Sequence, residues 1–267
     1  MFRSIKSLHG CVVRAFDGDI GSVNQVYFDD ESWGVRYLVV ETGNWLSDRQ
    51  VLISPYSVEH ADVASNAIHV SLTRQQVRDS PHIDAHKPVS RQHEIEYLRY
   101  YNYPTYWGGP NLWGMGAYPA FDPTTSTPDE NKALPARPIL HTSRPRADVH
   151  LRSTQAVKGY HLQTADGSIG HVSDFIYDDE AWVIRYLVID TRNWWPGGKE
   201  VLIATHWLDE IDSFASTVST SLTRKVIEQS PAYDDSVPLH RSYEVALHHF
   251  YGKHGYWLNA GLHGHAP

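Results

Sequence analysis

Hydrophobic residues along the chain occur in short runs that are separated by glycines and polar turn residues. β-Branched and aromatic residues are frequent in these runs, which is typical of a meander of short β-strands. The pattern predicts strands near residues 10–15, 21–28, 35–41, 50–54 and 67–72. Asp17-Gly18 predicts a tight hairpin turn, because both residues tolerate the positive φ that such turns need.

The predicted strand at residues 35–41 is apolar on both faces. Alternate positions from Val35 to Val40 place valine, tyrosine and valine on one face and arginine, leucine and valine on the other. A single open sheet would leave one of these faces in water. We therefore expect a sheet curled into a small barrel, whose second face rests on a helix or on a sister unit.

Two short helices are expected after the strands. Leu72 to Val77 predicts the first, with Thr73 or Ser71 as its cap and a break at Ser80-Pro81. The segment from Arg91 to Tyr101 places three apolar residues near helical spacing and predicts the second. Its equivalent later in the chain is the segment from Tyr243 to Tyr251.

The same pattern occurs twice. The stretch from Gly10 to Trp45 returns from Gly159 to Trp194 at a constant offset of 149, and 17 of these 36 positions are identical. The offset is 150 after Trp45, because an extra residue falls in a polar turn. The sequence thus predicts a first repeat at residues 1–107 and a second at 151–258, followed by a Gly/His tail at 259–267.

Residues 108–150 form a segment rich in proline and glycine between the two repeats. Dense prolines cannot continue a helix or a central strand, so this segment is expected to be extended or irregular. We favour a linker laid over a neighbouring surface, and a segment that recognises a partner is the alternative.

The recurring motifs together resemble the PRC-barrel family. They are the Asp-Gly turn with its following Ile-Gly, the Asp-Asp-Glu-x-Trp loop, the Arg-Tyr-Leu-Val strand, and Ser-Leu-Thr-Arg followed by Ser-Pro. The resemblance implies a mainly β fold with two small, partly open SH3-like barrels in tandem, each followed by short C-terminal helices. It relates the barrel to the C-terminal domain of the photosynthetic reaction-centre H subunit and to the ribosome maturation factor. Such modules bind other proteins, some are linked to stress responses, and no catalytic residues come with the family.

Composition and charge narrow the classes of partner. The net charge of −8 repels phosphate polyanions, so nucleic acid is a disfavoured partner. Cys11 is the only cysteine, which excludes an intramolecular disulfide and fits a reducing compartment. No signal-peptide pattern and no apolar run of membrane-spanning length is visible, so a cytoplasmic protein without a membrane span is expected.

A metal or cofactor site that belongs to the repeated module should occur in both repeats. The 17 histidines do not recur at matched positions, so no metal site is predicted, and the C-terminal histidines from His248 to His265 are interpreted as part of a solvated tail. The triplets Asp29-Asp30-Glu31 and Asp178-Asp179-Glu180 do recur, but they lack the ligand spacing of a calcium loop and are interpreted as solvated turns. No cofactor is predicted, because no nucleotide-binding or nucleophile motif occurs.

Three recurring pairs of residues are candidates for interaction or for structure. Trp33 and Trp182 are interpreted as packing residues, with an exposed contact anchor as the alternative. Arg36 and Arg185 lie in mid-strand among apolar neighbours, where a structural salt bridge is expected. Trp45 and Trp194, the last residues of the two matching stretches, are the third pair of candidates.

These observations favour a non-enzymatic protein-binding or scaffolding module. A homodimer is plausible, and the protein partner is not identified by the sequence. One alternative is an enzyme or a small-ligand-binding protein with its pocket between the two repeats. A second alternative is an RNA- or ribosome-associated factor that uses the basic later part of the linker.

Overall fold

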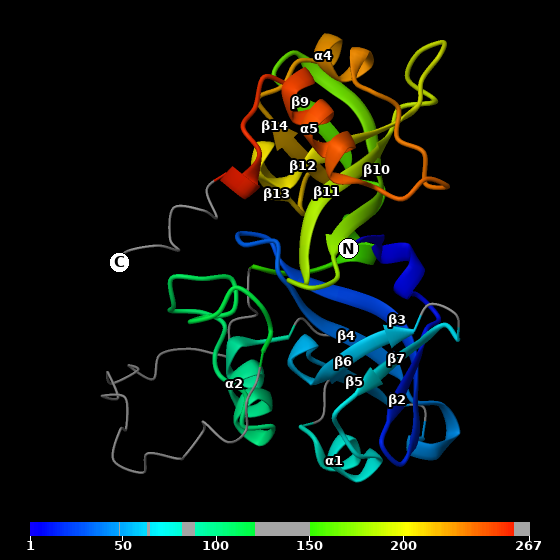
Figure 1. The fold of residues 1–267 in the computed structure, drawn as a ribbon, viewed down its shortest axis with the longest axis vertical. Helices are drawn as coiled ribbons and strands as arrows, with labels where there is room; N and C mark the ends of the chain where they lie inside the picture. The colour runs from blue at the N-terminus through cyan, green and yellow to red at the C-terminus, as the bar shows by residue number, and fades with distance from the viewer. Residues whose placement is uncertain (48, 63–64, 82–88, 121–149, 259–267) are drawn as a thin grey trace. The chain divides into compact units, whose positions relative to one another are not determined.

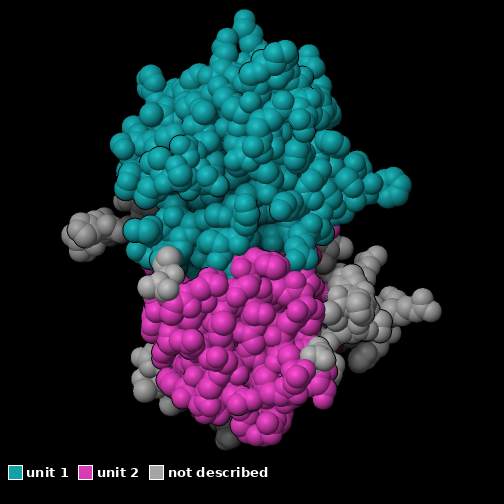
Figure 2. All heavy atoms as spheres, turned by 90° about the vertical axis from the view of Figure 1, so that its right-hand side faces the viewer, with its two compact units in different colours: residues 1–8, 154–267 teal, residues 9–153 magenta. Residues whose placement is uncertain are grey.

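The polypeptide folds into two compact units. The structure, a computed structural model, describes residues 1–47, 49–62, 65–81, 89–120 and 150–258. Residues 9–153 form one unit, here called the central unit, and residues 1–8 together with 154–267 form the other, the terminal unit. Figure 2 colours the atoms of each unit. Among the described residues, no helix is long and apolar enough to span a bilayer.

The central unit is built on one curled sheet (Figure 1). Its strands are β2 (Val12–Ala15), β3 (Gly18–Asp29), β4 (Val35–Glu41), β5 (Gln50–Ile53), β6 (Val58–Asp62), β7 (Ala67–Val70) and β8 (Leu151–Ser153). Neighbours follow the order β5-β4-β3-β2-β7-β6, and β8 pairs with β3. The end strands β5 and β6 are not paired with each other among the described residues, so the barrel is partly open.

The terminal unit repeats this sheet with the same topology. Its strands are β1 (Phe2–Ser4), β9 (His161–Thr164), β10 (Gly167–Asp178), β11 (Val183–Asp190), β12 (Glu200–Ala204), β13 (Leu208–Asp212) and β14 (Thr217–Thr220). Their order is β12-β11-β10-β9-β14-β13, and β1 pairs with β10. The predicted mainly β fold with two barrel-like sheets is confirmed.

The central unit contains two strands that the sequence pattern did not predict, β6 and the short strand β8. Strand β6 contains Val58, Glu59, His60, Ala61 and Asp62, and all five side chains are exposed or half-buried. An edge strand of this kind needs no apolar alternation, which is why the pattern did not reveal it. All five predicted strands of the first repeat are present: β4 has the predicted ends, and the ends of the other four are shifted by up to three residues.

Short helices follow each sheet. They are α1 (Arg74–Asp79), α2 (Arg91–Tyr100), α3 (Thr154–Val157), α4 (Arg224–Gln229) and α5 (Arg241–Phe250), with 3-10 turns η1 (Ile5–Leu8), η2 (Gly43–Leu46), η3 (Pro55–Ser57), η4 (Thr205–Trp207) and η5 (Tyr256–Leu258). Thr73 caps α1 through a capping box with Gln76, as expected for one of the two proposed caps.

Helix α2 covers the second apolar face of the sheet. The Tyr97 hydroxyl donates to the carbonyl oxygen of Leu52 at 3.1 Å, and the rings of Tyr37 and Tyr97 meet edge to face with centroids 5.3 Å apart. Every residue from Val35 to Val40 is buried. The sequence left open whether a helix or a sister unit rests on this face, and the structure places a helix there.

The recurring Ile-Gly pair marks a close approach of two strands. Gly21 has φ of +157°, and a Cβ atom there would lie 1.9 Å from the carbonyl oxygen of Glu41. At the equivalent Gly170, φ is +69° and a Cβ atom would lie 2.7 Å from the carbonyl oxygen of Asp190. Only glycine allows this contact, and this explains its recurrence.

The two repeats exchange their first strands. Strands β1 and β8 occupy equivalent positions in the repeats, at the offset of 149. Yet β1 pairs with β10 of the second repeat, and β8 pairs with β3 of the first. Sequence order placed Met1–Leu8 in the first repeat, whereas these residues belong to the terminal unit.

Candidate functional site: strand clasp and buried carboxylate

The exchanged strand is added to a free edge in each unit. Strand β2 pairs with the first part of β3, from Gly18 to Ser22, and β8 pairs with Tyr27–Asp29 beyond the end of β2. In the terminal unit, β1 likewise pairs with residues 176–178 of β10. The length difference between neighbouring strands thus creates the acceptor edge.

An arginine and an aspartate hold the added strand. In the central unit, Arg152 Nε donates to Asp30 Oδ2 at 2.7 Å, and His150 Nδ1 lies 3.1 Å from Asp30 Oδ1. In the terminal unit, Arg3 Nε donates to Asp179 Oδ2 at 2.6 Å, and the N-terminal amine donates to Asp179 Oδ1. We call this arrangement the strand clasp.

A serine on the added strand makes a second duplicated contact. Ser153 Oγ donates to Gln25 Oε1 at 2.6 Å, and Ser4 Oγ donates to the carboxylate of Asp174, which is the equivalent of Gln25. Burial raises the pKa of Asp174, while the hydrogen bond from Ser4 opposes that shift. The added strand in both units therefore consists of a hydrophobic residue, an arginine and a serine, and the sheet contacts the arginine and the serine through their side chains.

The acidic triplets correspond to the acceptor side of the clasp. Asp29 Oδ1 accepts the backbone N–H groups of Glu31 and Ser32 at 3.1 and 2.8 Å and so fixes the turn. Asp30, the next residue, binds Arg152 with only 11% of its side chain exposed. The interpretation as a solvated turn was wrong for these aspartates, because the arginine that pairs with Asp30 lies 122 residues away.

A second duplicated constellation surrounds a fully buried glutamate. In the central unit, Glu94 of α2 is 0% exposed and its Oε1 accepts the hydroxyls of Tyr37 at 2.9 Å and Tyr106 at 2.5 Å. Arg91 Nη1 lies 3.3 Å from its Oε2. In the terminal unit, Glu244 has the equivalent partners: Tyr186 at 2.7 Å, Tyr256 at 3.0 Å and Arg241 at 2.7 Å.

Burial sets the ionisation of these groups. It raises the pKa of Glu244, and the hydrogen bond from Tyr186 and the charge of Arg241 oppose that shift. Burial also raises the pKa of Tyr37 well above its usual range, and the nearby Glu94 adds to that shift. The tyrosines thus stay protonated as donors to a carboxylate that has no contact with solvent, which suits a structural lock better than acid–base chemistry.

The recurring arginines have aromatic neighbours instead of the expected carboxylates. Arg36 is 2% exposed, its guanidinium lies 3.9 Å from the ring centre of Tyr106, and it donates to the carbonyl oxygen of Leu112 at 2.8 Å. Arg185 lies 4.0 Å from the ring centre of Tyr256. None of the ion pairs in the described part of the chain includes either arginine.

The four candidate tryptophans have different surroundings. Trp33 and Trp182 are 9% and 5% exposed, have positive φ, and pack against Phe28 and Tyr177. The ring of Trp45 lies under the guanidinium of Arg74 at 4.3 Å. Trp194 is 40% exposed and contacts His161 edge to face. The structure does not bring these residues together into one site.

Glu94 and Glu244 were not singled out from the sequence. Their signal was the recurrence, at the offset of 150, of an arginine and a glutamate three residues apart on an otherwise apolar helix face. Another difference concerns His248, which was assigned to a solvated tail. It is 2% exposed and its Nε2 lies 3.2 Å from the Tyr186 hydroxyl, whereas His263 and His265 lie outside the described residues.

The early part of the predicted linker packs on the central unit. Trp113 is 3% exposed, and its carbonyl oxygen accepts a hydrogen bond from Tyr56 at 3.5 Å. This agrees with a segment laid over a neighbouring surface for residues 108–120. Residues 121–149 lie outside the described part of the chain.

Comparison with known proteins agrees with the architecture. Residues 2–77 match the PRC-barrel domain family, and the match includes the exchanged strand β1. A comparison with curated proteins finds no match. The second repeat shows the same strand order and the same clasp as the first. Residues 2–77 of the chain therefore carry a match to the PRC-barrel domain family.

Proposed function

We propose that the chain is a non-enzymatic scaffolding protein whose barrels bind protein partners by strand addition. The observation that carries this proposal is the reciprocal strand exchange. Each sheet is completed by a short strand from the other repeat, held by main-chain pairing and by the arginine–aspartate clasp. Main-chain pairing supplies affinity in strand addition, and side-chain contacts supply specificity.

The duplicated ionisable groups support the non-enzymatic part of the proposal. Glu94 and Glu244 are 0% exposed and already accept two tyrosine hydroxyls each. A general acid or base must reach a substrate within hydrogen-bond distance. These carboxylates are committed to holding a helix on the sheet.

The clasp defines the chemistry of the partner. A matching segment is extended and presents a hydrophobic residue, an arginine and a serine in succession. The same addition between two chains would produce a homodimer. In both cases the acceptor is the edge of β3 or β10 together with Asp30 or Asp179.

The proposal is tested on the full chain with a peptide of residues 1–8 that keeps its free amine and is labelled at its C-terminus. In the Arg3→Glu variant, the charge of β1 repels Asp179 and releases the acceptor edge. We expect saturable peptide binding to this variant by fluorescence anisotropy, and about 10-fold weaker binding when Asp179→Asn is added, since a charged hydrogen bond contributes about 1.5–3 kcal/mol.

Two controls accompany this measurement. The Lys225→Glu variant changes an exposed charge on α4 of the same unit and should bind no more peptide than the unmodified chain. A peptide with glutamate in place of Arg3 should bind weakly. Absence of saturable binding to a folded Arg3→Glu variant at millimolar peptide would refute strand addition.

A further inference from the structure

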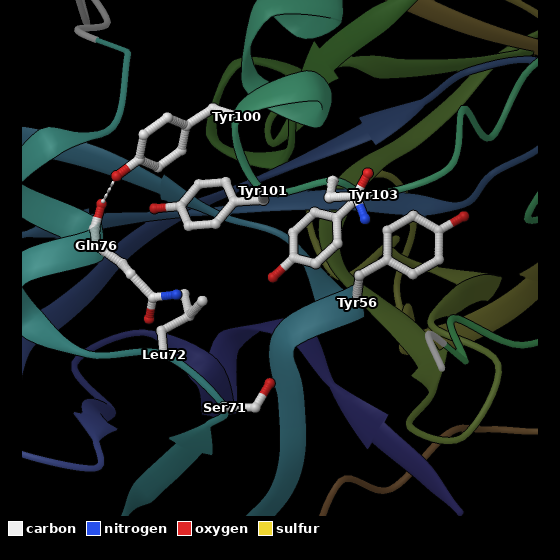
Figure 3. A pocket seen from close by; sticks show the side chains of 8 residues that line it. Tyr56, Ser71, Leu72, Gln76, Tyr100, Tyr101 and Tyr103 are labelled. Atoms are coloured by element: carbon white, nitrogen blue, oxygen red, sulfur yellow. Dashed lines mark hydrogen bonds between the residues drawn. The ribbon is translucent and has the colours of Figure 1, made fainter. Parts of the chain in front are cut away.

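The central unit contains a pocket that neither the clasp nor the buried carboxylate uses. It has a volume of about 560 Å³, within the range of small-ligand pockets. Its lining residues are Tyr56, Ser71, Leu72, Gln76, Tyr100, Tyr101, Asn102 and Tyr103 (Figure 3). No lining residue carries a charge at neutral pH, so the pocket suits a neutral ligand.

Four tyrosine rings form a continuous row along the pocket. The ring centres of Tyr56 and Tyr103 are 5.4 Å apart, those of Tyr103 and Tyr101 are 5.4 Å apart, and those of Tyr101 and Tyr100 are 4.8 Å apart. Because each ring is supported by its neighbour, little side-chain entropy remains to be lost when a ligand binds. Tyr56 and Tyr101 are 6% and 9% exposed and support the row, whereas Tyr103 is half-buried and Tyr100 is 41% exposed, so these two rings offer the accessible apolar surface.

Gln76 supplies a fixed hydrogen-bond donor on the rim. Its Oε1 accepts the backbone N–H and the hydroxyl of Thr73 at 2.8 and 3.1 Å, which assigns the other terminal atom as the NH₂ group. Figure 3 shows this nitrogen on the pocket side. The Tyr100 hydroxyl already donates its hydrogen to the backbone carbonyl oxygen of Gln76, at 2.9 Å. A ligand that matches this rim needs carbonyl acceptors.

The second repeat lacks these features, although it has the clasp and the buried carboxylate. At the positions of Gln76, Asn102 and Tyr103 it has valine, glycine and lysine. At the position of Ser57 it has Trp207, which packs on Tyr251, the equivalent of Tyr101, with ring centres 4.7 Å apart. The clasp and the buried carboxylate recur in both repeats, but this pocket wall does not. The divergence indicates a role that is separate from the fold.

We infer that the tyrosine row with Gln76 binds a proline-rich peptide segment in the polyproline II conformation. Proline rings are flat, neutral and apolar, and aromatic-lined grooves accept them at little entropic cost. A polyproline II segment makes no internal hydrogen bonds, so its carbonyl oxygens are available to the Gln76 amide. The site contains none of the clasp residues, so the inference does not depend on strand addition.

Other ligand chemistries fit the lining less well. Acidic, basic or phosphorylated peptides need a charged partner, and the pocket residues include none. A sugar presents many hydroxyl donors, and carboxylates, their strong acceptors, are likewise absent from this lining. A proline tract presents acceptors without N–H donors and therefore leaves fewer groups unsatisfied.

The inference is tested with the full chain and a capped decaproline peptide, by isothermal titration calorimetry. A capped (Gly-Ser)₅ peptide and maltohexaose serve as comparison ligands. We expect saturable binding of decaproline only. The Asn102→Gly variant removes a rim amide and introduces the residue of the second repeat at φ of +55°, where glycine is conformationally favoured, so folding is preserved. We expect decaproline to bind this variant 3- to 10-fold more weakly.

The Gln76→Val variant, which also mirrors the second repeat, should weaken decaproline binding by a similar factor. The matched control is Gln75→Val, one residue away on α1 and outside the pocket lining, which should leave the affinity unchanged. No saturable decaproline binding at millimolar concentration would overturn the inference, and so would Asn102→Gly and Gln76→Val variants that bind decaproline as tightly as the unmodified chain does. Saturable binding of maltohexaose and not of decaproline would show that the pocket binds a sugar and would overturn the assignment to a proline-rich peptide.

Discussion

Arg36 shows how a single residue can remain charged inside this fold. Burial lowers its pKa, and no carboxylate among the described residues forms an ion pair with it. The rings of Tyr106 and Trp113 lie 3.9 and 4.9 Å from its guanidinium carbon and face it with π-electron density. A cation–π contact of about 2 kcal/mol at a desolvated site offsets part of the cost of burial. The recurring arginine is therefore a packing residue that carries a charge.

His248 distinguishes the second repeat from the first at the residue scale. Its equivalent in the first repeat is Leu98, which is likewise buried. The His248 ring lies beside those of Trp207 and Trp257, with centres 4.8 Å away in each case. Burial lowers its pKa, and the charge of Arg241 lowers it further, although a hydrogen bond with the carbonyl oxygen of His254 opposes this.

This burial predicts a pH-dependent stability. The folded state holds His248 neutral, whereas in the unfolded chain it takes up a proton near its ordinary pKa of about 6.5. The unfolded state then binds more protons, so the free energy of unfolding should fall as the pH drops below about 6.5 and be unaffected by this group above that value. Urea unfolding between pH 7.5 and 5 measures this slope.

His248→Leu, the residue of the first repeat, should reduce the slope. His249→Leu replaces an exposed imidazole on the same helix and is the matched control. Equal slopes for His248→Leu and the unmodified chain would show that His248 does not contribute to the pH dependence.

At the scale of elements, the buried glutamates hold a helix against a strand. Glu94 belongs to α2, Tyr37 belongs to β4, and Tyr106 follows the helix, so one carboxylate ties three segments together. The arrangement recurs at Glu244 with α5 and β11. A short helix with few apolar residues gains its position from this lock more than from its own propensity.

We expect Glu94→Gln to destabilise the central unit by about 2–4 kcal/mol, because a neutral amide would replace the buried carboxylate that accepts two tyrosine hydroxyls and pairs with Arg91. Glu96→Gln, on the exposed side of the same helix, should change the free energy of unfolding by less than about 0.5 kcal/mol. Chemical unfolding of both variants measures the difference. A loss below 1 kcal/mol for Glu94→Gln would contradict the lock.

At the scale of the whole molecule, strand exchange makes the structural units differ from the sequence repeats. The central unit is one continuous segment, residues 9–153, because it ends with its added strand β8. The first repeat as defined by sequence, residues 1–107, contains β1 but lacks β8. Its acceptor edge at Tyr27–Asp29 therefore has no strand from the second repeat.

This difference predicts how two fragments behave. Residues 9–153 should fold as a monomer, since every strand of the sheet is present. Residues 1–107 should form a dimer in which β1 of each copy adds to β3 of the other, since Arg3 and Asp30 can rebuild the clasp. Sedimentation velocity at several concentrations distinguishes these states. A monomeric 1–107 fragment at all concentrations would count against exchange between chains.

Much of the fold followed from local sequence. The alternation of apolar residues, the Asp-Gly and Ile-Gly pairs and the capping residue Thr73 act over a few residues, so the sequence alone predicted most strands, the two helices after the first sheet and the duplication. The edge strand β6 was missed because its polar side chains carry no alternation. The roles of Glu94, Asp30 and His248 depend on partners far apart in sequence.

The chain by itself therefore determined two copies of one curled sheet, because short-range patterns encode strands, turns and caps. Only the tertiary structure decided which copy receives each first strand. Both acceptor edges offer an aspartate, Asp30 or Asp179, and both added strands offer an arginine, Arg3 or Arg152, so the local chemistry of the two pairings is nearly the same. The choice between them depends on how the whole chain folds, and no local pattern contains that information.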